Sequence, residues 1–243
     1  MLDSHCHILP DFDDGSSSME ESVEMARMAL LSGVTDIACT PHFEGRPGFL
    51  EHTDTIARRF DAFSQALAQA QIPVRLHRGA EVLCLPETPL LASEHKLPTL
   101  GSGSYALVEF FFDESYAYMD QMLSEIASSG YRLVVAHPER YGAIQRDPHL
   151  LKRWARQGFA LQLNKGSVLG AFGPRAEQTA GAILEMGLAH LFATDAHSCH
   201  SRTPHIGALR EWIEECCDED YAQILLQRNP RRILAGQRLV GED

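Results

Sequence analysis

Short apolar runs alternate along the chain with longer segments whose apolar positions recur every three to four residues. The short runs predict buried strands, and the longer segments predict the helices that connect them. Alternation of this kind is typical of parallel strands joined by crossover helices. The predicted strands are Leu2–His7, Thr35–Thr40, Val74–Val82, Ala106–Phe112, Arg132–Ala136, Ala160–Leu163 and His190–Thr194.

The segment after the first strand carries the clearest helix boundaries. Ser18 can cap its N-terminus, and Glu21, three residues later, completes a capping box. Val23 and Ala26 begin an apolar stripe at helical spacing, and Gly33 lies where the helix should end. Further helices are predicted over Thr53–Gln71, Ser115–Ser129, Pro148–Gln157, Pro174–Met186 and Pro204–Cys216, with a shorter pair around Glu219–Gln227 and Pro230–Leu234.

The alternation continues from end to end of the chain. No linker, charge block or low-complexity tract interrupts it, so we expect a single domain over residues 1–243. A closed α/β barrel and an open doubly wound sheet both fit this order of elements. A GxGxxG or P-loop fingerprint would favour the open sheet, and neither occurs in the sequence.

Composition narrows the functions that suit this fold. A net charge of −12 argues against nucleic acid as a partner, because binding to a phosphate backbone needs a basic face. The sequence contains no run of 18 apolar residues and no signal peptide, so we expect no membrane span and a cytoplasmic location. Six cysteines without a CxxC motif agree with a reducing compartment.

The ends of the predicted strands are rich in metal-binding side chains. His5 and His7 end the first strand, and their spacing directs both imidazoles to one face. Asp195 and His197 repeat this spacing after the seventh strand. Because barrel enzymes build their active sites at the C-terminal ends of strands, these residues predict one metal centre. Three further strands end in potential ligands, namely His42, Glu81 and His137.

An acidic loop after the first strand adds candidate ligands. Asp11, Asp13 and Asp14 precede Gly15, and each could equally belong to a solvated turn, although Asp14 is the preferred ligand. Mixed histidine and carboxylate ligands suit Mn, Fe, Zn or Co. Five histidines and three acids are too many for one tetrahedral ion, so we expect two or three ions with a bridging carboxylate. The other histidines are interpreted as surface or packing residues, namely His52, His77, His95, His149, His190, His200 and His205.

Two arginines are candidates for binding a phosphate group. Arg140 lies three residues after His137, and its guanidinium offers a fork that fits phosphate oxygens. Arg46 follows the second strand and is the weaker candidate for contact with phosphate or substrate. Glu109 and Asn164 also lie at strand ends, where a structural hydrogen-bonding role is at least as good an interpretation.

Taken in order, the HxH, TPH, GAE, HPER and TDAH motifs resemble those of the polymerase and histidinol phosphatase (PHP) superfamily. The segment DSHCHILP at 3–10, followed by DDG at 13–15, is similar to one branch, the capsular-polysaccharide protein-tyrosine phosphatases of the CpsB/CapC type. The segments GSVLG at 166–170 and NPRRIL at 229–234 also resemble that branch. The resemblance extends from residue 2 to about residue 236.

This resemblance implies a distorted seven-stranded (β/α) TIM-like barrel with a trinuclear centre that often contains manganese, with Fe, Zn, Co or Mg as alternatives. It assigns one ion to His5, His7, Glu81 and Asp195. It assigns the second ion to His137 and the bridging Glu81, and the third to Asp14, His42 and His197. Arg140 would bind the phosphate, and the implied catalytic residues are Arg140, Asp195 and His42.

The implied reaction is hydrolysis of a phosphomonoester by metal-activated water. The implied substrate is tyrosine-phosphorylated protein, and the implied partner is a tyrosine kinase of polysaccharide export. A small-molecule phosphatase, such as histidinol phosphatase, and a non-catalytic metal-binding regulatory protein remain as alternatives.

Four further positions bear on this interpretation. A cysteine-based mechanism is rejected, because it needs a Cys-x5-Arg loop and Cys39 and Arg46 are one residue too far apart. Phe43 stands where the branch often has a second histidine, and Lys165 stands where a small residue is expected. Both departures are expected to affect the pocket and substrate preference more than metal binding.

Overall fold

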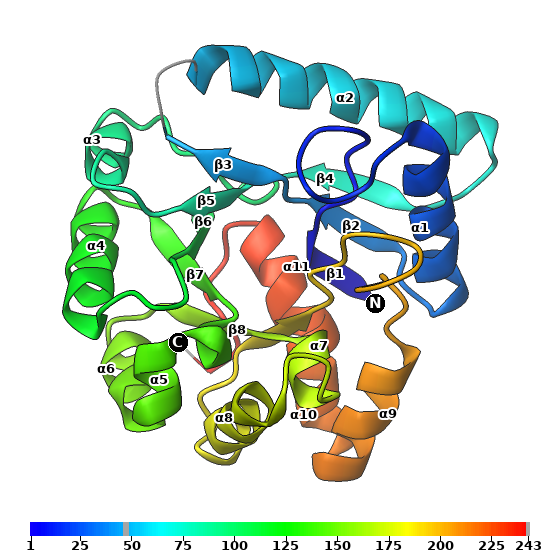
Figure 1. Ribbon diagram of the computed structural model, residues 1–243. Coiled ribbons are helices and arrows are strands. Elements are labelled where there is room, and N and C mark those ends of the chain that lie inside the picture. The colour runs from blue at the N-terminus through cyan, green and yellow to red at the C-terminus, as the bar shows by residue number, and fades with distance from the viewer. Residues whose placement is uncertain (46–48, 242–243) are drawn as a thin grey trace.

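The computed structural model describes residues 1–45 and 49–241, with residues 49–52 described by their backbone alone. Strands and helices alternate along it, as the sequence predicts (Figure 1). The strands are β1 Leu2–Cys6, β2 Asp36–Cys39, β3 His42–Glu44, β4 Arg75–Arg78, β5 Glu81–Leu83, β6 Tyr105–Glu109, β7 Arg132–Ala136, β8 Ala160–Asn164 and β9 Leu191–Ala193.

The helices differ widely in length. The α-helices are α1 Met19–Leu31, α2 Phe49–Gln69, α3 Thr88–Ser93, α4 Tyr116–Ser128, α5 Gly142–Arg146, α6 Leu151–Arg156, α7 Lys165–Val168, α8 Pro174–Glu185, α9 Gly207–Cys216, α10 Glu219–Gln223 and α11 Asn229–Leu234. Two 3₁₀ turns, η1 Pro138–Arg140 and η2 Pro148–Leu150, and a π-helical turn, η3 Ile224–Arg228, complete the set. The predicted helix over Pro148–Gln157 is thus divided between η2 and α6.

The strands of the described segments pair in parallel in two sheets, with the orders β1-β2-β4 and β3-β5-β6-β7-β8-β9. An isolated bridge between Cys6 and Ala196 joins the end of β1 to the segment after β9. The predicted parallel α/β fold is therefore confirmed. The strand count differs, because the described residues form nine strands instead of seven, and neither sheet closes on itself.

The extra strands come from breaks that the hydrophobic pattern does not reveal. Val74–Val82, predicted as one strand, is divided between β4 and β5, which belong to different sheets. Gly79 lies at the break, where a Cβ atom would be 2.8 Å from Leu100 Cδ2 and 3.2 Å from Thr40 Cγ2. The close approach of these side chains requires glycine and ends the β4 pairing. The short β3 likewise follows Pro41, which lacks the N–H that would continue a ladder.

The start of α1 follows the predicted capping signal only in part. The Glu21 N–H donates to Ser18 Oγ at 3.1 Å, as an N-cap requires. The Glu21 carboxylate, however, accepts from the N–H and hydroxyl of Ser17 instead of the N–H of Ser18. Helix α1 is therefore capped at the predicted place by a variant of the predicted box.

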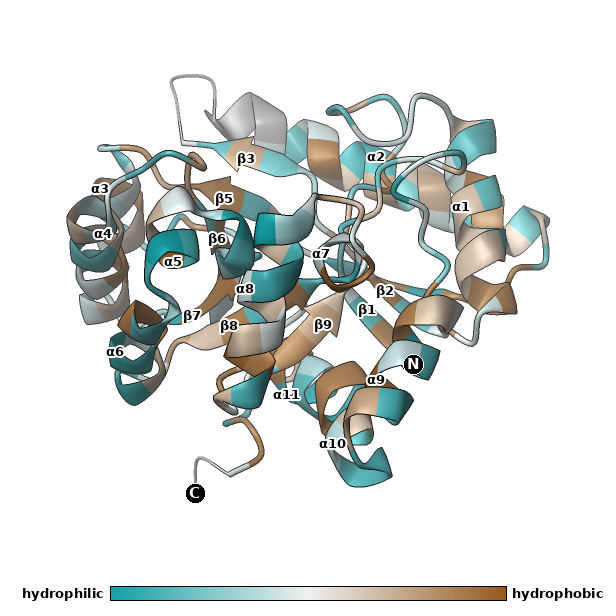
Figure 2. Ribbon diagram, turned by 60° about the horizontal axis from the view of Figure 1, so that its bottom comes forward, coloured by the Kyte–Doolittle hydropathy of each residue, from teal (hydrophilic) through white to brown (hydrophobic). Residues whose placement is uncertain are grey.

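Most strands are buried on both faces, with β3 and β4 as partly exposed exceptions, and their polarity changes along their length. Outward-facing residues such as Val135 pack in the layer beneath the helices, while inward-facing residues such as Leu107 pack with Leu234 of α11. Figure 1 shows α11 in the middle of the strands, and Figure 2 shows hydrophilic turns on the outer helices α5, α6 and α8. On the inner face, Leu107 is followed two positions later by Glu109, so polar side chains gather toward the C-terminal ends of the strands.

Candidate metal centre

Eight side chains that the sequence predicts as metal ligands lie together in the structure. They lie in or just after the C-terminal ends of β1, β2, β4, β7 and β9, and contacts of 3.0–3.6 Å connect them into one group. The parallel strands direct these ends to the same side of the molecule. The eight residues are His5, His7, Asp14, His42, Glu81, His137, Asp195 and His197.

Ligand atoms converge in the buried part of this group. His5 Nε2 and His7 Nε2 are 3.1 Å apart, and each lies 3.2 Å from Glu81 Oε2. Asp195 Oδ1 lies 3.5 Å from both ring nitrogens. Ligand atoms that are about 2.1 Å from one ion lie roughly 3–3.5 Å from one another, so this spacing fits a single bound cation.

The other ring nitrogens of these two histidines are already hydrogen-bonded. His5 Nδ1 lies 2.8 Å from Gln162 Oε1, and His7 Nδ1 lies 2.8 Å from Asp13 Oδ2. The Gln162 amide nitrogen donates to Leu163 O at 3.2 Å, which fixes the orientation of the amide. Both partners are acceptors, so Nδ1 carries the proton of each neutral ring and Nε2 presents a lone pair. Lone pairs that face a carboxylate in a buried site need either a proton or a metal ion between them.

Glu81 presents its two oxygens to different histidines. Oε2 faces His5 and His7, and it also lies 3.2 Å from His42 Nδ1. Oε1 lies 3.0 Å from His137 Nε2. A carboxylate with this arrangement can bridge two neighbouring ions.

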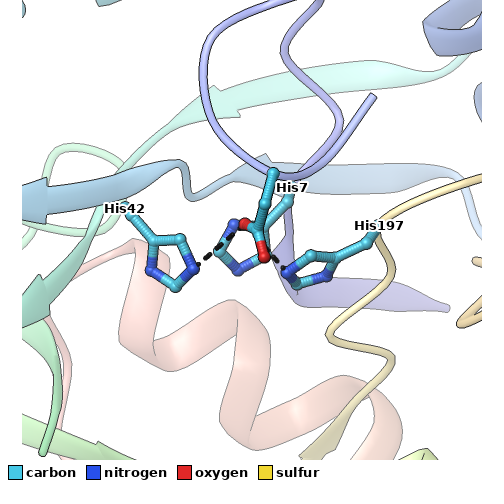
Figure 3. A group of neighbouring side chains, drawn as sticks. His7, His42 and His197 are labelled. Atoms are coloured by element: carbon cyan, nitrogen blue, oxygen red, sulfur yellow. Dashed lines mark ion pairs between the residues drawn. The ribbon is translucent and has the colours of Figure 1, made fainter. Parts of the chain in front are cut away.

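An outer group of ligands lies closer to solvent. Figure 3 shows His7, His42 and His197 turned toward one another from separate segments of the chain. Asp14 Oδ1 lies 3.3 Å from His42 Nε2 and 3.5 Å from His197 Nε2. The Asp14 side chain is 67% exposed, whereas Glu81 is 1% exposed. The group therefore has an enclosed inner part and an outer part that substrate can reach.

Electrostatics in the metal-free site favour bound protons. Burial lowers the pKa of His7, but hydrogen bonds to Asp13 and Glu81 outweigh burial and raise this pKa to about 9. For His42, burial is outweighed by the carboxylates that face its two ring nitrogens, and its pKa rises to about 11. The hydrogen bonds from His197 and His42 hold the pKa of Asp14 below its usual range. At neutral pH these imidazoles carry protons that a metal ion would displace.

Glu109, for which the sequence left a structural role open, lies beside the ligands. Its Oε1 is 3.0 Å from His42 Nδ1, and its Oε2 is 3.7 Å from His137 Nε2. With His42 and Glu81 it forms a further group whose ligand atoms could hold an ion. Asn164 has a different environment, because its amide nitrogen donates to Asp195 Oδ2 at 2.5 Å and so orients that carboxylate.

Two arginines reach the same carboxylate of the site. Arg140 Nη1 lies 3.4 Å from Asp195 Oδ2, and Arg202 Nη2 lies 2.6 Å from the same oxygen. The Arg140 guanidinium lies between the rings of Phe112 and Phe172, at 4.3 Å from each centroid. Arg202 was not predicted from the sequence, since nothing in its local pattern separates it from a surface arginine. Arg46, the weaker candidate, lies outside the described residues.

The three buried cysteines are poor candidates for the nucleophile of a cysteine-based mechanism. Cys6, Cys39 and Cys84 are buried, and burial raises the pKa of each of these thiols. Neutral buried thiols are inert packing residues.

The two departures from the branch pattern, Phe43 and Lys165, both make contacts that explain their place in the structure. Phe43 is buried in the hydrophobic core. The Lys165 ammonium donates to the backbone carbonyls of Thr203 and His205 and so holds the loop that contains Arg202.

The histidines predicted to lie outside the centre do not join the eight ligands in the described structure. His77 pairs with Asp36 at 3.0 Å, and His190 Nδ1 accepts from the Leu161 N–H. His200 lies near Glu21 and Cys199 in a small, partly exposed group. His95, His149 and His205 are exposed. The side chain of His52 lies outside the described residues.

Comparison with known proteins agrees with the motifs. The family model "Capsular polysaccharide synthesis, CpsB/CapC" matches residues 1–235. The tyrosine-protein phosphatase YwqE of Bacillus subtilis is 34% identical over 206 residues, which are 84% of this chain and 80% of YwqE. CpsB of Streptococcus pneumoniae, also a tyrosine-protein phosphatase, is 30% identical over 98% of this chain and 99% of its own length.

A solved structure gives the same result. It comes from a study of YwqE and CpsB, described as unique metal-dependent tyrosine phosphatases, and it superposes with a TM-score of 0.86. It is 31% identical to this chain and covers 98% of this chain and 96% of its own. In the described part of the chain, no helix is long and apolar enough to cross a membrane. The chain belongs to the CpsB/CapC family of capsular polysaccharide synthesis.

Proposed function

We propose that this chain is a metal-dependent protein-tyrosine phosphatase that acts in the synthesis of capsular or extracellular polysaccharide. The observation that carries the proposal is the convergence of His5 Nε2, His7 Nε2 and Glu81 Oε2 within 3.1–3.2 Å of one another. Because both Nδ1 atoms are already hydrogen-bonded to acceptors, the Nε2 lone pairs are the atoms that can bind a metal ion once the rings are deprotonated. The matched relatives supply the reaction class.

The proposed centre holds two or three divalent ions, with manganese as the preferred metal. The spacing of the ligand atoms supports one ion at His5, His7, Glu81 and Asp195. The two-sided contacts of Glu81 support a second ion shared with His137, and Glu109 is a further candidate ligand there. Contacts of 3.3–3.5 Å support a third ion at Asp14, His42 and His197.

The chain's own residues orient the substrate phosphate. Arg140 and Arg202 both lie at the edge of the centre, where their guanidinium groups can bind phosphate oxygens. Bound ions would supply a nucleophile derived from water and offset the charge on the phosphate. A phenol has a pKa near 10, so tyrosine leaves with little help from a general acid.

The same proposal includes the fold, the protein substrate, the partner and the cellular location of the enzyme. The two sheets are interpreted as parts of one distorted seven-stranded barrel within a single domain, because the bridge between Cys6 and Ala196 joins their edges. In this interpretation β2 with β3, and β4 with β5, each count as one interrupted strand. The substrate is proposed to be a tyrosine-phosphorylated protein, with a tyrosine kinase of polysaccharide export as partner. The proposed location is the cytoplasm.

The experiment removes and restores the metal. Protein stripped with a chelator is assayed on p-nitrophenyl phosphate and on a phosphotyrosine peptide, with Mn, Mg, Zn or no metal added. We expect activity on both substrates only with metal, and its loss in His42→Ala and Arg140→Ala. Activity on the small ester alone would favour a metabolite phosphatase, and no turnover by the folded, metal-loaded protein would contradict the proposal.

A further inference from the structure

A cavity of about 270 Å³ opens directly beside the metal centre. His42, Glu44 and Glu109 form its polar side. Leu83 and the run Phe110, Phe111 and Phe112 form its apolar side. The volume is slightly below the range of about 300–1,000 Å³ that is typical of ligand pockets, so it suits a single ring. The cavity therefore combines reacting groups with an apolar wall.

Two adjacent aromatic side chains of this wall are exposed. Phe111 is 52% exposed and Phe112 is 46% exposed, whereas Phe110 is 2% exposed and packs in the core. Scattered exposed apolar residues are ordinary, but neighbouring aromatic rings that line a cavity are typical of ligand-binding surfaces.

The wall is held in place before any ligand binds. The Gly142 N–H donates to Phe112 O at 2.7 Å, and the Glu114 N–H donates to Phe111 O at 3.0 Å. The Phe112 ring lies 4.3 Å from the Arg140 guanidinium and 5.9 Å from the His137 ring. Phe112 of the aromatic wall thus packs directly against the arginine that is placed to bind phosphate.

We propose that Phe111 and Phe112 form a subsite for the aromatic ring of an aryl phosphomonoester whose phosphate lies at Arg140. The proposal rests on the proposed phosphatase function, and it adds a reason why the enzyme would select aryl over alkyl phosphate esters. A planar apolar ring gains contact area and aromatic pairing against this wall. An alkyl phosphate such as phosphoserine has no ring to fill the cavity, so the subsite favours aryl over alkyl esters.

The test uses the metal-loaded full chain and two non-hydrolysable inhibitors, phenylphosphonate and methylphosphonate. In Phe111→Ala we expect the Ki of phenylphosphonate to rise about tenfold. The Ki of methylphosphonate should stay within about twofold, because the phosphate-binding groups are intact. The kcat/KM for a phosphotyrosine peptide should fall by a similar factor of about ten, mainly through KM.

Controls separate the ring subsite from a general structural role. Phe111→Tyr should keep wild-type values, and Leu31→Ala, at another exposed apolar position that is 78% exposed, should change neither Ki. Phe112→Ala should weaken both phosphonates, since this ring also supports Arg140.

Equal effects of Phe111→Ala on the two phosphonates would overturn the subsite while leaving the phosphatase function intact. The subsite would also be overturned, with the phosphatase function intact, if the wild-type protein hydrolysed alkyl and aryl phosphates equally well. A wild-type protein that hydrolyses no phosphate ester would overturn both proposals.

Discussion

Histidine and carboxylate side chains meet at both ends of the strands, with different outcomes. At the N-terminal ends of β2 and β4, Asp36 Oδ1 lies 2.9 Å from Arg75 Nε and 3.0 Å from His77 Nε2, and Thr35 donates to its other oxygen. Here a single carboxylate has a permanent cation and further donors. The group is electrostatically complete and needs no ion from solution.

At the C-terminal ends the balance is different. Five carboxylates face five imidazoles, and they belong to Asp13, Asp14, Glu81, Glu109 and Asp195. Within the described residues, the arginines that contact these carboxylates are Arg140 and Arg202, and both lie at Asp195. Residue types alone therefore do not identify a metal centre. A better indicator is a buried site in which carboxylates and imidazole lone pairs outnumber the arginine and lysine side chains that could pair with them.

The largest expected effect comes from Glu81→Gln. The amide removes the charge that faces four histidines, so the variant should bind less metal per chain. Loss of the charge stabilisation supplied by bound metal should lower kcat/KM for p-nitrophenyl phosphate about a thousandfold. Metal content by mass spectrometry and steady-state kinetics check this, and a fully metallated, active variant would falsify the role of Glu81.

Asp13→Asn should have a smaller effect on the same centre. It weakens the hydrogen bond that fixes the tautomer of His7, so metal affinity should fall about 10–100-fold. Titration with a competing chelator measures the change. Asp11→Asn is the matched control, because the Asp11 carboxylate pairs with Arg59 at the surface and should leave metal affinity unchanged. Equal losses in both variants would argue against the positioning role.

Metal affinity should also rise with pH. The pKa of His7 in the metal-free fold is raised from 6.5 to about 9, so its protonation stabilises that fold fully below pH 6.5, and this stabilisation is lost as pH rises through 9. Metal must displace this proton, so affinity should increase about tenfold per pH unit for each proton released. Chelator competition from pH 6.5 to 9 tests this expectation, and a flat profile would contradict it.

The smallest effect on activity is expected at the opposite end. Asp36→Asn should leave kcat/KM within about twofold. The Asp36 carboxylate lies at the opposite end of the strands from the candidate metal centre, and its partners Arg75, His77 and Thr35 satisfy it without a metal ion. The substitution should lower the free energy of unfolding by about 1–2 kcal/mol through weaker hydrogen bonds to a partly exposed partner. Urea denaturation measures the stability, and a large loss of activity in a folded variant would show that the two ends are coupled.

Much of the fold could be predicted because it depends on local pattern. Alternating strands and helices specify a parallel α/β fold, and the position of α1 follows from Ser18 and Glu21. The division of Val74–Val82 could not be predicted, because Gly79 is required by Leu100 and Thr40, which are remote in the sequence. Strand breaks of this kind depend on contacts that a local hydrophobic pattern does not contain.

For the site, the local pattern specifies which ligand types lie at the ends of which strands, since period-two alternation and the shared direction of parallel strands bring them to one end. The hydrogen bonds and ion pairs that orient these ligands come from residues that the local pattern does not identify. Gln162 orients His5 across 157 positions of sequence, and Arg202 reaches Asp195 from a loop where its own φ is +49°. The exposed Phe111 likewise becomes a candidate for ligand binding only because it lines the cavity beside the metal centre. Distances between remote side chains are set by packing, which no local pattern encodes.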